Sequence, residues 1–212
     1  MSFYNARGGG IYPGVIEGNA LTGMRHRVAV SIERVLDSCL KQETAEHTKL
    51  RISKISPSDP TPPLKFQSAF SVQTPAAVSE ISIARLAERP EFARIKCIVT
   101  IPMRVTFEDS KGKKFTAESE LAVPEDVILY VPKTSIFPFE VKAAASVNCA
   151  EGKPSGENAF SVTACYTIIT KITAPTDLLI PAYGFCPTPH AVDFSKEESS
   201  EFFDLPLYPS GR

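Results

Sequence analysis

Histidines, cysteines and a pair of carboxylates are the residues of this chain that could carry chemistry. The histidines are His26, His47 and His190, which lie far apart in the sequence. A three-histidine metal site would need the fold to bring them together, so solvated histidines are the simpler expectation. Glu118 and Glu120 are two residues apart, and on a strand both would face the same side. Such a pair could act as the acid and base of a hydrolase, although a solvated sheet face is the simpler interpretation.

The five cysteines have long spacings without a C-x-x-C pair, so their spacing predicts no zinc site. Either Cys97 or Cys165 beside a histidine could form a nucleophilic pair. Both lie in strand-like patterns, which favours buried structural thiols. Because the count is odd, at least one thiol stays unpaired within a monomer, and crosslinks between copies are the alternative to reduced, buried cysteines. The five are Cys39, Cys97, Cys149, Cys165 and Cys186.

Several function classes are disfavoured by what the sequence lacks. It contains no phosphate-binding glycine motif, no G-x-S-x-G and no H-E-x-x-H, and Gly8–Gly10 lie at no strand–helix junction, so no cofactor and no catalytic residue are expected. The net charge of −1 argues against nucleic-acid binding. No apolar run is long enough for a transmembrane helix, and the first residues do not form a signal peptide, so the protein is expected to be made in the cytoplasm without membrane partners. The absence of tryptophan disfavours a carbohydrate-binding module.

The strongest structural pattern spans residues 93–124. Apolar residues alternate with polar ones from Ile95 to Phe107 and again from Phe115 to Val123. This period of two predicts two long strands, each with one buried face. Between them Gly112 supplies the positive φ of a tight turn, so the segment is predicted to be an antiparallel hairpin.

Similar runs recur along the rest of the chain and predict about eight to ten strands. Two of them are ambiguous, since Ile32–Leu40 and Glu80–Arg89 also fit helical spacing. Proline-rich or glycine-rich loops are expected at 56–63 and 151–158, and Val127–Val131 and Leu178–Ile180 look like short separate runs. Further strands are expected within 28–36, 50–55, 66–72, 137–149 and 160–172. Connections this short cannot hold helical crossovers, so residues 26–189 are predicted to form an all-β, antiparallel β-sandwich.

Both ends of the chain differ in composition from this domain. Residues 1–25 hold six of the eleven glycines and read as a flexible arm, and residues 190–212 read as an acidic, aromatic tail. Either end could be a disordered tail or could dock on a neighbouring subunit. The apolar residues that would do so are Phe3, Tyr4, Ile11, Tyr12, Val15, Ile16, Phe202 and Phe203.

Three segments carry a family resemblance: ERVLDSC at Glu33–Cys39, DVILYVP at Asp126–Pro132, and PTDLLIPAYGFCPTP at Pro175–Pro189. Over residues 28–189 the chain resembles poorly characterised proteins of spore-forming clostridia. The resemblance implies a spore-surface role in the coat, exosporium or an appendage, with synthesis in the mother cell and other coat proteins as partners. It also implies crosslinks formed after mother-cell lysis, for which Cys39 and Cys186 are the candidates.

The hypothesis that follows is a non-enzymatic structural protein that self-assembles as a homo-oligomer, surface layer or filament through terminal-arm docking or strand addition. A glycan- or protein-binding module that uses the sheet face around Arg104–Glu120 is the alternative. A hydrolase built on Glu118 or Glu120 is the third possibility.

Overall fold

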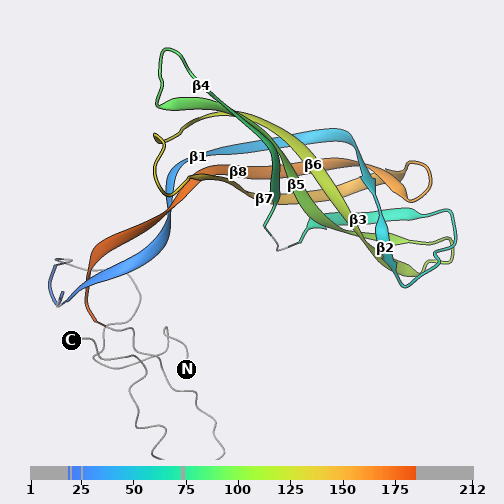
Figure 1. Ribbon diagram of the computed structural model, residues 1–212. Helices are drawn as coiled ribbons and strands as arrows, with labels where there is room; N and C mark the ends of the chain where they lie inside the picture. The colour runs from blue at the N-terminus through green and yellow to red at the C-terminus, as the bar shows by residue number, and fades with distance from the viewer. Residues whose placement is uncertain (1–18, 20, 25, 73–74, 185–212) are drawn as a thin grey trace, which may run out of the picture. The chain divides into compact units, whose positions relative to one another are not determined.

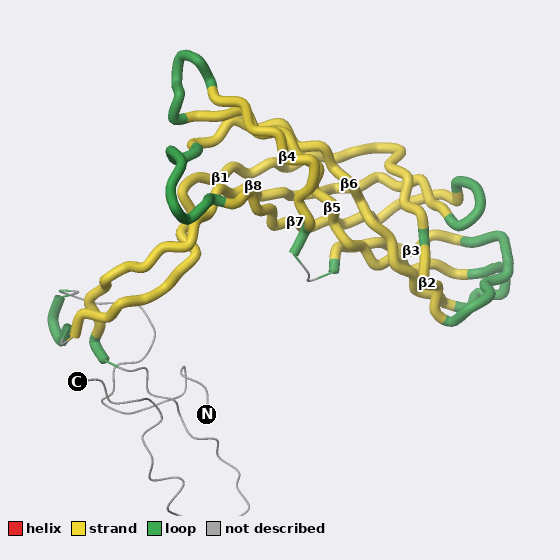
Figure 2. Tube along the Cα trace, in the orientation of Figure 1, coloured by secondary structure: helices red, strands yellow, loops and turns green. Residues whose placement is uncertain are grey.

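The computed structural model describes residues 19, 21–24, 26–72 and 75–184, and within this part of the chain every regular element is a strand (Figure 2). The strands are β1 (His26–Arg51), β2 (Ser53–Ser56), β3 (Lys65–Ser71), β4 (Ala77–Arg85), β5 (Phe92–Glu108), β6 (Lys114–Tyr130), β7 (Glu140–Pro154) and β8 (Ala159–Ala182). The all-β class predicted from the alternating residues is confirmed.

The strands form one eight-stranded sheet with the order β1-β8-β7-β3-β5-β6-β2, and β4 pairs with β5 beside this path (Figure 1). The ladders with a determined register are antiparallel. The longest one joins β5 and β6 without a register shift from Phe92↔Tyr130 to Glu108↔Lys114, which confirms the predicted hairpin.

The sheet folds over on itself, so that β5 and β6 lie across β7 and β8 (Figure 1). Alternate residues of these strands bury their side chains in one shared core. Phe160 of β8 contacts Phe107 of β5, with ring centroids 5.6 Å apart, and also packs against Phe66 at 5.4 Å. These aromatic contacts join the two layers, as expected of a sandwich whose apolar faces cover each other. The core is tight at Gly152, where an added Cβ would lie 2.8 Å from side-chain atoms of Phe66 and Val162.

The junction between β1 and β2 also covers part of this core. Leu50 and Ile52 are buried in it, and the backbone N–H of Ile52 donates to the carbonyl of Asn158. Beyond this point β2 leaves the β8 layer and pairs with β6, with Ser53 opposite Glu118. The buried Ser119 hydroxyl donates to the carbonyl of Arg51 at 2.8 Å. One stretch of chain therefore belongs to both layers.

The turn between β5 and β6 is fixed by Asp109. Its Oδ1 accepts hydrogen bonds from the backbone N–H groups of Lys111 and Lys113, each at 2.9 Å. Gly112 takes a φ of 74°, as the sequence predicts. Burial opposes ionisation of Asp109, but the backbone hydrogen bonds from Lys113 and Lys111 outweigh it and lower the pKa of this carboxyl. The charged side chain thus stabilises the turn.

Two prolines lie inside the long strands, where a missing N–H would normally break a ladder. The carbonyl of Pro102 accepts from Val72 on the side of β5 away from β6, so its nitrogen also faces that side. On that side β3 ends opposite Met103 and β4 begins opposite Thr100, so Pro102 faces the gap between the two strands. The ladder needs no N–H donor at this position. The nitrogen of Pro124 points away from β5 in the same way, because Pro124 pairs with Ile98, an even number of residues from Pro102. It faces a part of the β6 edge that β2 does not reach, so no hydrogen bond is lost there.

The chain divides into two compact units. Residues Ile32–Thr176 form the first, which contains the sandwich core and every site described below. The described ends of β1 and β8, residues 26–31 and 177–182, belong to the second unit. In that unit Val28, Leu179 and Ile180 are exposed apolar side chains.

Several element boundaries differ from those that the sequence predicts. Of the two segments with helical spacing, Ile32–Leu40 lies in β1, and Glu80–Arg89 is strand in β4 as far as Arg85 and a loop beyond it. The runs Val127–Val131 and Leu178–Ile180, expected to be separate, are continuations of β6 and β8 as far as those strands reach. The loop expected at 151–158 is shorter, because β7 continues to Pro154. The proline-rich loop expected at 56–63 is present but begins after Ser56, which is the last residue of β2.

Candidate functional site

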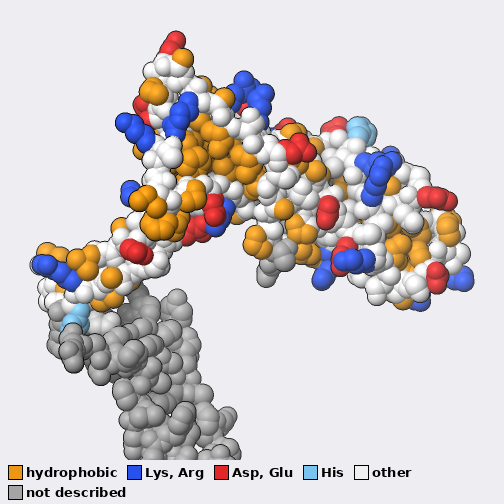
Figure 3. All heavy atoms as spheres, viewed as in Figure 1, with side chains coloured by type: hydrophobic (Ala, Val, Ile, Leu, Met, Phe, Trp, Pro, Cys, Tyr) orange, Lys and Arg blue, Asp and Glu red, His pale blue; other side chains and the backbone are white. Residues whose placement is uncertain are grey.

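An open groove separates β4 from the start of β7, and we call it the edge groove. It has a volume of about 910 Å³. Its large apolar side chains include Val78, Ile81 and Ile83 from β4, Phe139 just before β7, and Val141 near the start of β7. Figure 3 shows hydrophobic side chains at the surface near β4.

The groove exists because β3 is short. β3 joins β5 to β7, where Ala69 pairs with Cys149 and Phe70 pairs with Asn148. Past Ser71 its place beside β5 is taken by β4, and in the described residues the chain here is bridged to β7 at Ala76↔Ala143, one residue before β4 begins. Beyond this bridge the two strands have no ladder between them in the described residues. Two strand edges therefore face each other without a partner strand, the arrangement to which an added strand can pair.

The register shows that β4 leaves part of the core face uncovered. Ile83 is opposite Ile95, so both side chains project from the same face of the sheet. Ile95 is fully buried, whereas Ile83 is 40% exposed and Ile81 is 46% exposed. A bulge between Ser79 and Ser82 lies in this stretch of β4, with Glu80 at a φ of 52°. The hydrophobic layer thus continues past the point where the opposing strands cover it.

The charged residues at the rim of the edge groove are paired with one another. Lys142 forms ion pairs with Glu33 and, at 3.1 Å, with Glu140. Hydrogen bonds from Lys142 and Thr173 lower the pKa of the Glu33 carboxyl. Because these charges satisfy each other, the groove presents an apolar floor and open backbone groups to an incoming segment, without an unpaired charge.

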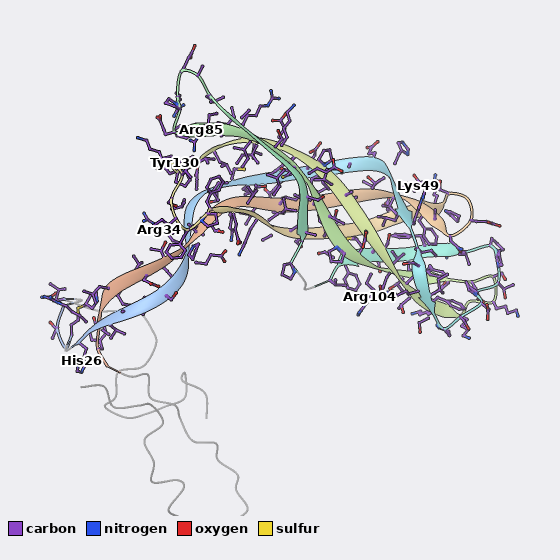
Figure 4. All side chains as sticks on the ribbon, viewed as in Figure 1. His26, Arg34, Lys49, Arg85, Arg104 and Tyr130 are labelled. Carbon is purple, nitrogen blue, oxygen red and sulfur yellow. The ribbon has the colours of Figure 1, made fainter. Side chains whose placement is uncertain are left out.

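A second concavity, which we call the basic hollow, lies where β2, β5 and β6 meet the end of β1. It has a volume of about 950 Å³. Its charged residues are Lys49, Arg51, Lys54, Arg104, Glu118 and Glu120. In Figure 4, Lys49 and Arg104 lie on separate strands, in the half of the sheet away from Arg85 and Tyr130.

Glu118 and Glu120, the predicted hydrolase pair, both line the basic hollow. Each is exposed on the outer face of β6, as the alternation predicts. Glu118 is paired with Lys54 at 2.6 Å. Both side chains are exposed, and Lys54 already engages Glu118. The geometry therefore favours a solvated sheet face over an acid–base pair.

The described cysteines are free thiols, and three of them are poor nucleophiles. Burial raises the pKa of Cys149 to about 11. Burial and the nearby Glu125 charge also raise the pKa values of Cys39 and Cys97, which disfavours the reactive thiolate. Cys165 is exposed and lies 3.5 Å from the Thr44 hydroxyl.

The other candidate residues fall mostly outside the described part of the chain. His190, Cys186 and the apolar residues named for the arm and tail lie there, so docking and crosslinking by them stay predictions. Among the residues that the structure describes, no group of three His, Cys, Asp or Glu side chains could hold a metal ion. No helix long and apolar enough to cross a membrane occurs among them either.

A buried ion pair between the layers was not anticipated. Glu125 of β6 is 2% exposed, and its Oε1 accepts from Lys41 of β1 at 3.1 Å. Lys41 also reaches Glu43 at 3.3 Å, and Glu43 accepts from the Tyr166 hydroxyl at 2.7 Å. The second carboxylate oxygen of Glu125 is buried without a partner in the structure, as is the Thr170 hydroxyl. The alternating pattern could have predicted this burial, because Glu125 follows Leu121 and Val123 at the same spacing of two residues and so faces inward like them.

Comparison of the chain with known protein families, with curated proteins and with solved structures gives no match. A functional proposal therefore depends on the geometry of the groove and the hollow and on the sequence of the two chain ends.

Proposed function

We propose that this chain is a non-enzymatic structural protein whose copies join by strand addition at the edge groove. The observation that carries the proposal is the pair of facing, unpartnered strand edges above an apolar floor. Backbone groups at an open edge gain hydrogen-bond partners from an added strand, and pockets between the side chains give specificity. Ile81 and Ile83 lose their contact with water in the same step.

The occupant is the N-terminal arm of a second copy. Its segment Ile11–Ile16 has six residues, none of them charged, and four are large and apolar. The stretch Val78–Ile83 of β4 also has six residues, and both would extend about 20 Å as strands. An uncharged segment fits a groove whose rim charges are already paired. Phe3 and Tyr4 extend the same arm toward its start.

The free energy of the arm–groove contact supports assembly when the contact is repeated between many copies. Burying a whole isoleucine side chain stabilises by about 1.5–3 kcal/mol, so covering the exposed half of Ile81 and of Ile83 contributes about 1 kcal/mol each. The arm's own apolar side chains and the new backbone hydrogen bonds add to this. Because an arm and a groove are different surfaces, the contact is head-to-tail and extends into a filament or layer unless it closes into a ring.

The resemblance of the end segments to clostridial spore proteins supports a spore surface as the location of this assembly. In this proposal the protein is made in the mother cell and added to the coat, the exosporium or an appendage. Cys39 and Cys186 would crosslink neighbouring copies after mother-cell lysis. Mass spectrometry of non-reduced assemblies tests the crosslinks, and disulfides between other cysteines would contradict this part.

Ile83→Glu in the full chain tests the proposal, because it places a charge on the floor of the edge groove. At a high salt concentration, which screens electrostatic contacts between copies, negative-stain microscopy and sedimentation velocity should show polymers for the wild type and monomers for the variant. The matched control is Ile128→Glu, since Ile128 is 57% exposed and lies opposite Arg94 on the outer face of β6. Far-UV circular dichroism reports whether each variant folds.

Removal of residues 1–20 should have the same effect as Ile83→Glu, because it deletes the donor strand and leaves the groove intact. Polymers formed at high salt by either the truncated chain or Ile83→Glu would refute strand addition at this groove.

A binding module is the second candidate function, and the basic hollow is the observation that favours it. The hollow occupies the face around Arg104–Glu120 and has more positive than negative side chains. It would hold an acidic glycan or protein segment. A glycan array and a pull-down with the full chain test this, and enrichment that survives Arg104→Glu would contradict it.

A further inference from the structure

The basic hollow contains three positive side chains that have no partner among the described residues. Lys49, Arg51 and Arg104 make no side-chain hydrogen bond or ion pair with any residue that the structure describes. Among the six charged residues of the hollow, four are positive and two are negative, so the local charge is +2 in a chain whose net charge is −1.

The Glu118 carboxylate does not pair with these three groups, because its partner in the hollow is Lys54. Glu118 contacts the Lys54 ammonium at 2.6 Å. That contact, with the nearby Glu120 charge as a smaller contribution, raises the pKa of Lys54. The guanidinium groups of Arg51 and Arg104 and the Lys49 ammonium therefore remain available to an anionic ligand.

The wall of the hollow also offers apolar surface. Val72 and Pro102 are half-buried and line it, beside the mostly buried Ile52 and Met103. Positive side chains around an apolar wall fit a ligand that carries both carboxylates and hydrophobic side chains. A small inorganic anion would use only the charges.

The chain itself contains a segment with this composition. Residues 195–204 read SKEESSEFFD, with four acidic residues against Lys196 and with Phe202 and Phe203 side by side. The net charge of this segment is −3, opposite in sign to that of the hollow. The acidic residues are Glu197, Glu198, Glu201 and Asp204.

We propose that the basic hollow binds the acidic tail segment 195–204 of a second copy of the chain. The inference rests on the proposed function in that both concern self-assembly, but it uses a different surface and the opposite end of the chain. Each subunit then offers two acceptor sites, an apolar groove for the arm and a charged hollow for the tail. The tail contact is electrostatic and weakens as salt rises, whereas the groove contact does not.

A labelled peptide of residues 195–208, titrated with the full chain, measures the contact directly by fluorescence anisotropy. Arg104→Glu should weaken binding by about tenfold or more, and raising the salt concentration should weaken binding to the wild type. The matched control is Lys133→Glu, since Lys133 is exposed and does not line the hollow. Equal affinity of the Arg104→Glu variant and the control would overturn the proposal.

A charge-swap experiment shows whether the tail binds within a copy or between copies. One full-length variant carries Arg51→Glu and Arg104→Glu, and the other carries Glu197→Lys, Glu198→Lys and Glu201→Lys. In a sample of either variant alone, the hollow and the tail carry charge of the same sign and repel each other. In a mixture, the reversed hollow of one variant can bind the reversed tail of the other, and the native hollow can bind the native tail. Both variants also carry Ile83→Glu, which removes the groove contact.

Sedimentation velocity should then show monomers for each charge-swap variant alone and heterodimers for the mixture. Monomers in the mixture would overturn binding between copies. The two proposals fail separately, because loss of the tail contact leaves Ile83-dependent polymers of the native chain. Failure of the groove proposal leaves the heterodimer of the mixture.

Discussion

Lys41→Met should destabilise the fold strongly, because it leaves the buried Glu125 carboxylate without its cation. At 3.1 Å and an effective dielectric constant of about 20, the Coulomb attraction is roughly 5 kcal/mol. The Lys41 side chain is 35% exposed, so water screens part of this attraction. Breaking buried pairs costs about 3–5 kcal/mol, and the partial exposure places this one near 3 kcal/mol.

Stability should recover when both charges of the Lys41–Glu125 pair are removed. In Lys41→Met/Glu125→Leu no charge remains buried, and the unpartnered carboxylate oxygen is gone as well. Replacing a buried pair by apolar residues of similar volume is often neutral or stabilising, so the double variant should lie within about 1 kcal/mol of the wild type. Urea denaturation followed by circular dichroism measures the free energy of unfolding of all three proteins.

Lys54→Met is the matched control for this experiment. Lys54 and Glu118 are closer, at 2.6 Å, but their side chains are 74% and 60% exposed. An exposed pair contributes little, so the free energy of unfolding should hardly change. A Lys41→Met variant as stable as Lys54→Met, or a double variant no more stable than Lys41→Met alone, would refute the reasoning that burial rather than distance decides.

Three further changes test how the fold is held. Gly152→Ala should cost about 1–3 kcal/mol in urea denaturation by forcing a methyl group into the filled core, and an unchanged midpoint would contradict the tight packing. Arg85→Ala should cost about 1–3 kcal/mol, since its guanidinium donates to the carbonyls of residues 90, 131 and 132 at 2.6–3.0 Å, and Arg85→Lys should recover only part. The lowered pKa of Asp109 means that its ionised form stabilises the fold above pH 3.8, the ordinary value, and that this contribution is lost as the pH falls below it. Asp109→Asn should therefore flatten the fall in stability with acid, and an unchanged pH profile would contradict this.

Alternation predicts the β5–β6 hairpin well because both strands lie against the core on one face and face water on the other. Alternation predicts the ends of strands poorly. At Pro124, for example, the proline suggests that the strand ends, but β6 continues to Tyr130. The ladder tolerates this proline because its nitrogen faces an open edge, and that depends on where β2 stops. The lengths of β7 and β8 likewise depend on their pairing with each other, from Glu140↔Thr173 to Pro154↔Phe160.

The two candidate surfaces differ in how much of them the sequence reveals. The Arg104–Glu120 face follows from the period of two along β5 and β6. Lys49 joins it only because β1 crosses between layers, which a local pattern cannot show. The edge groove depends on the failure of β4 and β7 to pair beyond Ala76↔Ala143, residues far apart in the chain. A period-two pattern places Ile83 on the core side but says nothing about which strands cover it.

Amide hydrogen exchange read by mass spectrometry tests strand addition most directly. Samples of the full chain are compared when dilute and when concentrated enough to polymerise. Exchange should slow on assembly at residues 77–85, 140–146 and 11–16, with no such change in Ile83→Glu. Unchanged exchange at both strand edges in a polymerised sample, with protection elsewhere, would show that the copies join through another surface.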